Sequence, residues 1–257
     1  MNFYKAFFLE KEIKSLDGLR AMACLMVIIA HLVEVHGSGL NSYLQQALDL
    51  GKEGVAFFFT ISGFIITYLL LREKKSKDTI KIKKFVLRRS IKIIPVLYLF
   101  LIFLVILNQL NFVKIHPDNF LSSFLFFRNY SNAPYSAFTG HVWSLAVEEH
   151  FYFFWPAIIL FLNKKHLFYF AIFVILISPL IRVGTFYYFP ELHIRQDIMT
   201  HCRIDSFMFG ALLAMAYFED KLKWLNSKIK HPALTLWCLI IFYCLIHPTL
   251  KMHSFKG

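Results

Sequence analysis

Residues 51–71 read GKEGVAFFFTISGFIITYLLL and carry no charged side chain after Glu53. A run of this length matches the ~20 residues that a helix needs to cross ~30 Å of hydrocarbon. Similar runs recur along the chain, where 58% of the 257 residues are hydrophobic and only 17% are charged. Soluble domains usually contain about 25% charged residues. The composition therefore excludes an ordinary soluble enzyme and predicts an all-α, polytopic transmembrane helix bundle.

Seven apolar runs approach this length, and together they form a single predicted membrane domain over residues 1–257. We expect spans at roughly 19–36, 53–71, 93–113, 143–162, 167–183, 200–218 and 233–250. Another apolar stretch, 120–127, is too short to cross and indicates an interfacial or re-entrant segment. With a cytoplasmic N-terminus, 20 of the 28 Lys and Arg residues fall on the cytoplasmic side. Cytoplasmic loops are rich in these residues, so this orientation is predicted.

The net charge of +12 comes mostly from basic residues between the apolar runs. That distribution is typical of membrane-protein loops, and no nucleic-acid-binding module is visible. Ten basic residues lie in 72–92, where they could bind anionic lipid head groups. Alternatively, Arg88, Arg89 and Lys92 could hold the phosphates of a soluble donor, because Arg88 and Lys92 share one helix face.

Ionisable residues inside apolar spans are the most informative, since a charged side chain at mid-membrane costs at least ~2.5 kcal/mol. In the first span, Arg20 and His31 lie within about 20° of one helical stripe and ~16 Å apart along its axis. Glu34, one turn beyond His31, could orient the imidazole or simply meet the outer interface. A packing hydrogen bond from His31 to a neighbouring helix is the alternative.

The fourth span contains two adjacent carboxylates, Glu148 and Glu149. They are 100° apart on a helix, so they cannot both face one partner. The stripe of Glu148 also holds residues with polar tips: Ser144, Tyr152 and Trp155. Glu148 is therefore the better candidate to face a cavity. The alternative is that both carboxylates lie in water at the outer interface.

Two other spans contain polar or small residues with a structural and a functional explanation. The second span has residues that allow close helix packing: Gly54, Ser62 and Gly63. In the sixth span, His201 and Asp205 lie one turn apart with Arg203 nearby. This group fits a structural salt bridge at the outer end as well as a functional site.

Five motifs follow one another along the chain. They are LDGLRAMACLMVIIAHL (16–32), GVAFFFTISGFIIT (54–67), LRRSIKIIP (87–95), HVWSLAVEEHFYFFWP (141–156) and RIDSFMFGALLA (203–214). Together they resemble the acyltransferase 3 family of bacterial membrane acyltransferases. The resemblance implies a multi-pass protein of the bacterial inner membrane. It further implies transfer of acyl groups, usually acetyl, from acetyl-CoA or another acyl-CoA to hydroxyls of cell-surface glycans or lipid-linked saccharides, as in lipopolysaccharide or exopolysaccharide modification.

The resemblance also implies roles for particular residues. Arg20 and His31 match the family's Arg and His of the first span, and His31 is the expected catalytic base, a task that suits an imidazole. Glu148 and Glu149 match its paired acidic residues, one of which would orient or stabilise the imidazole. The other matches are Arg88 and Arg89, with Lys92 beside them, for the CoA phosphates, Ser62 and Trp143 within the second and fourth motifs, and Arg203 with Asp205.

The expected reaction needs no metal, and the 11 scattered histidines form no compact ligand set. The family pattern has about ten spans of ~20 residues. Because this chain offers seven, we expect it to lack the family's C-terminal helices. Two other functions stay open, a transporter that uses the buried charges as a proton relay and a non-catalytic subunit of a glycan assembly system. The transporter predicts inverted repeats, which the sequence does not show.

Overall fold

The computed structural model describes residues 14–36, 42–192 and 196–219, apart from the side chains of 14, 15, 33–36 and 42–50. All regular structure in this part of the chain is helical, which confirms the predicted all-α class. The order is α2 (Lys14–His36), α3 (Ser42–Lys77), α4 (Ile82–Gln109), α5 (Pro117–Phe124), α6 (Val142–Phe161), α7 (Lys164–Tyr188), η1 (Pro190–Leu192), η2 (Gln196–Ile198) and α8 (Thr200–Phe218). The predicted span 233–250 lies outside the described residues.

Three of the described helices are long and apolar enough, by length and composition, to cross a membrane. They are Gly51–Lys77, Ile82–Gln109 and Lys164–Tyr188. The first and third contain the predicted spans 53–71 and 167–183, and the second ends at Gln109, four residues before the end of the predicted span 93–113. Three more predicted spans correspond to the helices α2, α6 and α8. The short stretch 120–127 falls largely on α5, a helix of 8 residues.

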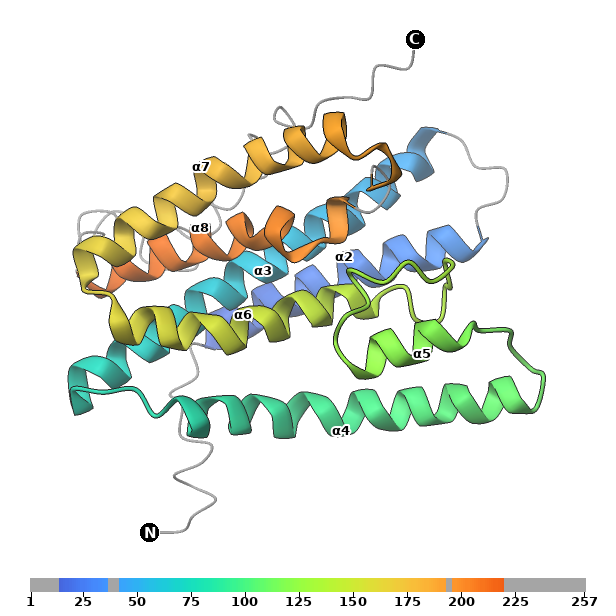
Figure 1. Ribbon diagram of the computed structural model, residues 1–257, viewed down its shortest axis with the longest axis horizontal. Coiled ribbons are helices and arrows are strands. Elements are labelled where there is room, and N and C mark those ends of the chain that lie inside the picture. The colour runs from blue at the N-terminus through green and yellow to red at the C-terminus, as the bar shows by residue number, and fades with distance from the viewer. Residues whose placement is uncertain (1–13, 37–41, 193–195, 220–257) are drawn as a thin grey trace. The chain divides into compact units, whose positions relative to one another are not determined.

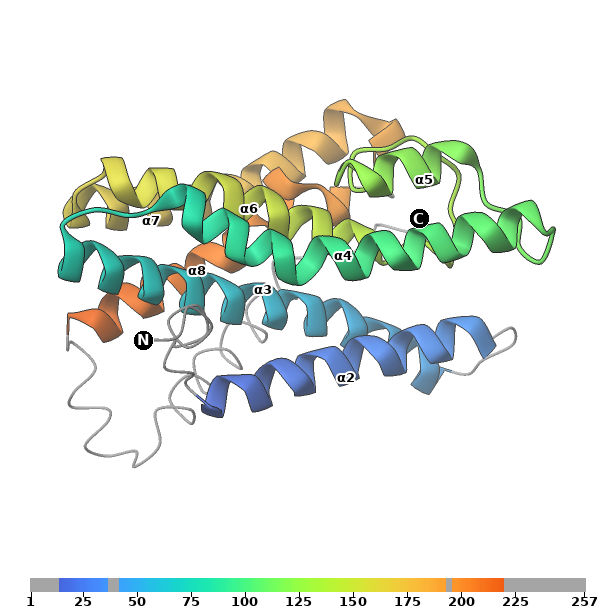
Figure 2. The same ribbon diagram turned by 90° about the horizontal axis from the view of Figure 1, so that it is seen from below.

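The chain divides into two compact units, Met1–Leu69 with Ser206–Gly257, and Leu70–Asp205, and both α3 and α8 continue from one unit into the other. In the first unit α2 runs along α3 (Figure 2). The core of this unit is an apolar cluster of Leu16, Leu19, Ala23, Phe57, Ile61, Phe64 and Ala214.

Glycines determine how closely these helices approach each other. A Cβ atom at Gly54 would lie 3.0 Å from the carbonyl oxygen of Ala23, so α3 lies directly against α2 at this point. A Cβ atom at Gly63 would collide with the backbone of Phe207 on α8. The predicted close approach of helix backbones at Gly54 and Gly63 is therefore confirmed.

Gly210→Ala should destabilise the protein by roughly 3 kcal/mol or more, because the added methyl group would overlap the carbonyl oxygen of Thr60 on α3. Gly184→Ala is the matched control, since nothing lies within 4 Å of its Cβ position. Alanine in a helix interior is favoured over glycine by ~0.5–1 kcal/mol. Thermal unfolding in detergent should show a lower Tm for the first variant and an equal or higher Tm for the second. Equal Tm values for both would contradict this packing.

In the unit Leu70–Asp205, α4 lies beside α6, and α5 lies beside the C-terminal half of α4 (Figure 1). The buried apolar residues Leu97, Leu101 and Val142 hold α4 and α6 together. The Tyr98 hydroxyl donates to the carbonyl of Phe124 at 3.1 Å and ties α5 to α4. These contacts fix the start of α6, the helix that carries the paired carboxylates.

The C-terminal end of α6 is capped by a lysine from the last turns of α3. Lys74 Nζ donates to the carbonyl oxygens of Ile159, Leu160 and Leu162 at 2.6, 3.0 and 3.0 Å. The last carbonyls of a helix have no intrahelical partner and carry partial negative charge, so they favour an ammonium group. One of the ten basic residues in 72–92 therefore stabilises α6.

Candidate active site

Arg20 and His31 lie on the single helix α2, which keeps the predicted separation of ~16 Å along one stripe. The Arg20 guanidinium carbon lies 4.9 Å from the ring centroid of Phe58 on α3, a cation–π contact. Arg20 is half-buried, whereas His31 is exposed near the C-terminal end of α2. The side chain of Glu34 lies outside the described residues. Ser62, on α3, is buried in the same unit.

The two carboxylates of α6 have different surroundings. Glu148 is 5% exposed, while Glu149 is half-buried. Tyr152 and Trp155, on the stripe of Glu148, are also buried, and Phe153, on the stripe of Glu149, is 64% exposed. The helix face that carries Glu148 therefore points toward the protein interior. This agrees with the prediction from the polar atoms of the side chains that share this face.

Arg89 of α4 approaches the same face of α6. Its guanidinium carbon lies 6.0 Å from the ring centroid of Tyr152 and 5.7 Å from that of Phe85. Glu149 interacts electrostatically with Arg89 as well as with Glu148. The structure therefore brings together a cation from the third motif and both carboxylates from the fourth.

Arg88 and Arg89 are 100° apart on α4, and Lys92 lies one turn beyond both, at i+4 from Arg88 and i+3 from Arg89. Arg88 and Arg89 are half-buried and Lys92 is exposed. Within the predicted basic group, Arg89 is the residue whose guanidinium lies against a ring of α6. Trp143, in the first turn of α6, is half-buried.

The acidic residue of the fifth motif is paired with α7. Arg182 Nη2 lies 2.9 Å from Asp205 Oδ2, and Arg182 Nη1 donates to the carbonyl of Cys202 at 2.5 Å. Arg203 Nε donates to the carbonyl of Asp197 at 2.5 Å. The sequence placed the charges of this motif beside one another on one helix and did not single out Arg182. An arginine at the end of an apolar run is the signal that could have identified it.

Arg182→Met should lower the free energy of unfolding by about 3–5 kcal/mol, because it removes the cation that faces the buried Asp205 carboxylate. Adding Asp205→Leu should restore most of that loss, since the double variant buries no unpaired charge there. Chemical unfolding of both variants in detergent measures the difference. A double variant no more stable than Arg182→Met would show that this ion pair is not the source of the effect.

Another chain of hydrogen bonds joins α6, the start of α8 and the segment after α5. Thr200 Oγ1 accepts from Asn129 Nδ2 at 2.8 Å and lies 2.7 Å from His150 Nδ1. The Thr200 hydroxyl is therefore shared between the Asn129 amide and the His150 ring. The backbone of Phe126 hydrogen-bonds the same ring. These partners lie far apart in the sequence, and no local sequence pattern predicts their contacts.

An aromatic pair extends this chain. The Tyr130 hydroxyl lies 2.9 Å from Nδ1 of His201, and their rings stack with centroids 5.7 Å apart. His201, predicted beside Asp205, is therefore tied to the segment after α5. Among the described residues, no group of three or more His, Cys, Asp or Glu side chains could hold a metal ion.

Comparison with known proteins shows which protein family the chain resembles. The family described as "Acyltransferase domain", acyltransferase 3, matches residues 13–255. The O-acetyltransferase OatA of Staphylococcus aureus (strain NCTC 8325) is 30% identical over 233 residues, which cover 83% of this chain and 36% of that protein. The Peptidoglycan O-acetyltransferase OatA of Listeria monocytogenes serovar 1/2a is 32% identical over 168 residues, covering 59% of this chain and 25% of that protein.

A protein of Staphylococcus aureus (strain COL), whose name gives O-acetyltransferase as a provisional activity, is 31% identical over 246 residues. That match covers 87% of this chain and 38% of the relative, so the chain spans well under half the length of these curated relatives. No solved structure matches the chain. The family match over nearly the whole chain confirms what the five motifs implied, and the protein belongs to the acyltransferase 3 family.

Proposed function

We propose that this chain transfers an acyl group, normally acetyl, from acyl-CoA to a hydroxyl of a cell-surface glycan. The observation that carries the proposal is the family match over residues 13–255, shared with relatives named O-acetyltransferases. One of these relatives is named for peptidoglycan, which makes peptidoglycan the first acceptor to test, with lipid-linked saccharides next.

In this proposal His31 is the base that removes the proton from the acceptor hydroxyl. An imidazole has a pKa near neutrality and can accept and return a proton in one cycle. Glu148, or Glu149 beside it, is the catalytic acid residue of the proposal. The buried position of Glu148 favours it for this role, since a carboxylate acts more strongly where water is excluded. Arg20 guides the donor toward His31.

The donor phosphates bind Arg88 and Lys92, two neighbouring cations of α4, of which Lys92 is exposed. An arginine binds a phosphate through two parallel hydrogen bonds, and a lysine adds a point charge. Arg89, which lies against Tyr152, supports the paired carboxylates Glu148 and Glu149. Trp143 lies in the first turn of α6 and Ser62 on the buried side of α3, and Arg203 and Asp205 stabilise the start of α8.

We further propose a multi-pass topology in the bacterial inner membrane with a cytoplasmic N-terminus. Three helices with the length and composition of membrane spans support a membrane location. Most Lys and Arg residues lie in segments predicted to be on the same side of the membrane as the N-terminus, and this distribution supports the orientation. This arrangement gives a cytoplasmic donor and an extracytoplasmic acceptor access to opposite ends of the protein.

Membranes that contain the protein, incubated with acetyl-CoA labelled in the acetyl group, test the function. We expect label in the glycan fraction, and label released by mild alkali, as an ester requires. Membranes without the protein are the control. Glycan that stays unlabelled, or movement of saccharide across the membrane without any donor, would reject acyl transfer and favour a transporter.

A further inference from the structure

The segment 117–140, which comprises α5 and the loop before α6, has a polar interior. Seven of its side chains are buried and all seven are polar: Asn119, Ser122, Ser123, Arg128, Asn129, Ser136 and Thr139. Its large apolar side chains are exposed or half-buried, and Leu121 and Leu125 are 60% and 62% exposed. This is the reverse of an ordinary domain, in which apolar side chains fill the interior.

The helix α5 shows this inversion most clearly. Asn119, Ser122 and Ser123 lie at helical positions i, i+3 and i+4, so they form a single buried face. Leu121 and Leu125 point away from the interior. An exposed apolar face of this kind suits a short helix at a membrane surface. The helix therefore has an apolar outer face and a polar face toward the interior.

Five of the six neutral buried side chains of the segment hold an atom that meets no hydrogen-bond partner among the described residues. These atoms are Asn119 Oδ1, Ser123 Oγ, Asn129 Oδ1, Ser136 Oγ and Thr139 Oγ1. A native protein leaves only a few such atoms in about 100 residues, because each one costs free energy in the folded state. Five of them in a segment of this size indicate groups that a hydrogen-bonding ligand completes.

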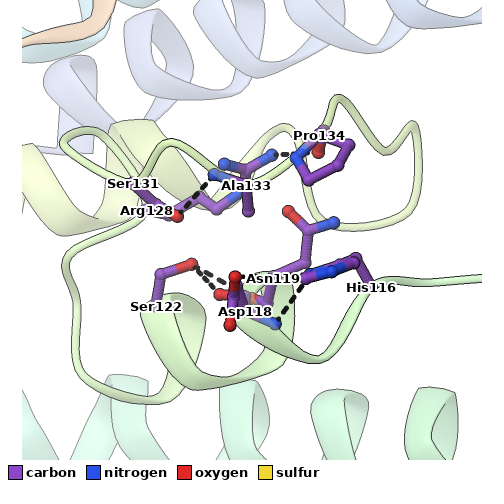
Figure 3. A network of polar contacts seen from close by, with 8 residues as sticks. All are labelled: His116, Asp118, Asn119, Ser122, Arg128, Ser131, Ala133 and Pro134. Atoms are coloured by element: carbon purple, nitrogen blue, oxygen red, sulfur yellow. Dashed lines mark hydrogen bonds and ion pairs between the residues drawn. The ribbon is translucent and has the colours of Figure 1, made fainter.

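The chemistry of these groups defines the ligand. All five are neutral, two of them amides and three of them hydroxyls. The one buried cation of the segment, Arg128, donates to the carbonyl of Pro134, and the Asp118 side chain is 64% exposed. Figure 3 shows the Asn119 side chain rising from α5 toward Arg128 and Pro134. Neutral amides and hydroxyls recognise hydroxyl and amide groups, as they do in polar ligand sites generally.

The segment 117–140 is also connected to α6, the helix that carries Glu148 and Glu149. Thr139 precedes the first residue of α6, Val142, and Glu148 lies ~9 Å further along that helix. Asn129 is tied to α6 through Thr200 and His150. A ligand held by the segment is thus held at the N-terminal end of the helix that carries Glu148.

We propose that the polar groups of Asn119, Ser123, Asn129, Ser136 and Thr139 form a sugar-binding subsite that recognises hydroxyl and acetamido groups of an N-acetylated hexose unit in the acceptor glycan. This inference rests on the proposed transfer function and names the part of the protein that holds the acceptor. Asn119 and Asn129 accept hydrogen bonds through their free amide oxygens. Ser123, Ser136 and Thr139 exchange hydrogen bonds with sugar hydroxyls.

The test uses Thr139→Val, Asn119→Leu and a matched control, Ser122→Ala, in the full chain in detergent. The Ser122 hydroxyl already donates within α5 to the carbonyl of Asp118 at 2.5 Å, so its loss should leave the subsite intact. The probe is chitotriose, a trimer of N-acetylglucosamine, with binding measured by calorimetry. We expect Thr139→Val and Asn119→Leu each to weaken chitotriose binding roughly tenfold, and Ser122→Ala to leave it unchanged.

Thermal unfolding separates this role from a purely structural one. Valine has the shape of threonine without the hydroxyl, so Thr139→Val should raise Tm in the absence of sugar, since it removes an unsatisfied buried group. A lower Tm with unchanged chitotriose binding would overturn the proposal, as would failure of the unaltered protein to bind chitotriose.

The acceptor KM makes failure of this inference distinguishable from failure of the proposed function. If glycan acetylation proceeds and Thr139→Val leaves the acceptor KM unchanged, the subsite is wrong while acyl transfer stands. If the protein binds chitotriose as expected but transfers no acetyl group, the subsite stands and the transfer function is wrong.

Discussion

His31→Ala should lower glycan acetylation by about a thousandfold, the range expected when a general base is removed. The side chain of His31 is exposed on α2, so its truncation removes few packing contacts and should change stability little. Loss of transfer would therefore report on chemistry and not on folding. The measurement is the rate of label transfer from acetyl-CoA to glycan at equal amounts of membrane-inserted protein.

His166→Ala is the matched control for this substitution. His166 is likewise exposed on a helix, α7, where its ring lies 2.9 Å from Asn163 Oδ1. Its replacement should leave the transfer rate within about twofold of the unaltered protein. If His31→Ala kept full activity, or if His166→Ala lost as much, His31 would not be the base and another residue would have to take the proton.

Local sequence patterns predicted the helices and the burial of their faces. The stripe of Glu148, Tyr152 and Trp155 is buried as expected because residues spaced three or four apart share a helix face in any fold. Glycine in a long apolar run likewise predicted close helix approach, which Gly54 and Gly63 both show.

Contacts between distant segments were not predictable in the same way. Asp205 meets Arg182 of α7, and Thr200 meets Asn129, because tertiary packing chooses the partners of polar groups. The inverted polarity of α5 was also missed. Its apolar residues predicted an interfacial or re-entrant segment, but only the structure shows that its Asn and Ser side chains form the buried face.

The basic group of α4 leads to the second large effect. Arg89→Leu should lower kcat about a hundredfold with little change in the KM for acetyl-CoA. Its guanidinium lies over Tyr152 and interacts with Glu149, so its loss leaves the two adjacent carboxylates without that compensating charge. Arg89 thus acts as a positioning residue for the acidic pair. Steady-state kinetics with varied acetyl-CoA concentration measures both constants.

Arg88→Ala and Lys92→Ala are the matched comparison, because they remove the two other cations of α4, to which the proposed function assigns the donor phosphates. Each should raise the KM for acetyl-CoA about tenfold and leave kcat nearly unchanged, since a phosphate contact far from the reacting atoms contributes equally to the ground and transition states. Arg89→Lys should recover part of kcat, because an ammonium still compensates charge but lacks the planar group that lies over the Tyr152 ring. If Arg89→Leu instead raised the KM for acetyl-CoA and spared kcat, all three cations would bind the donor, and the carboxylates would depend on another partner.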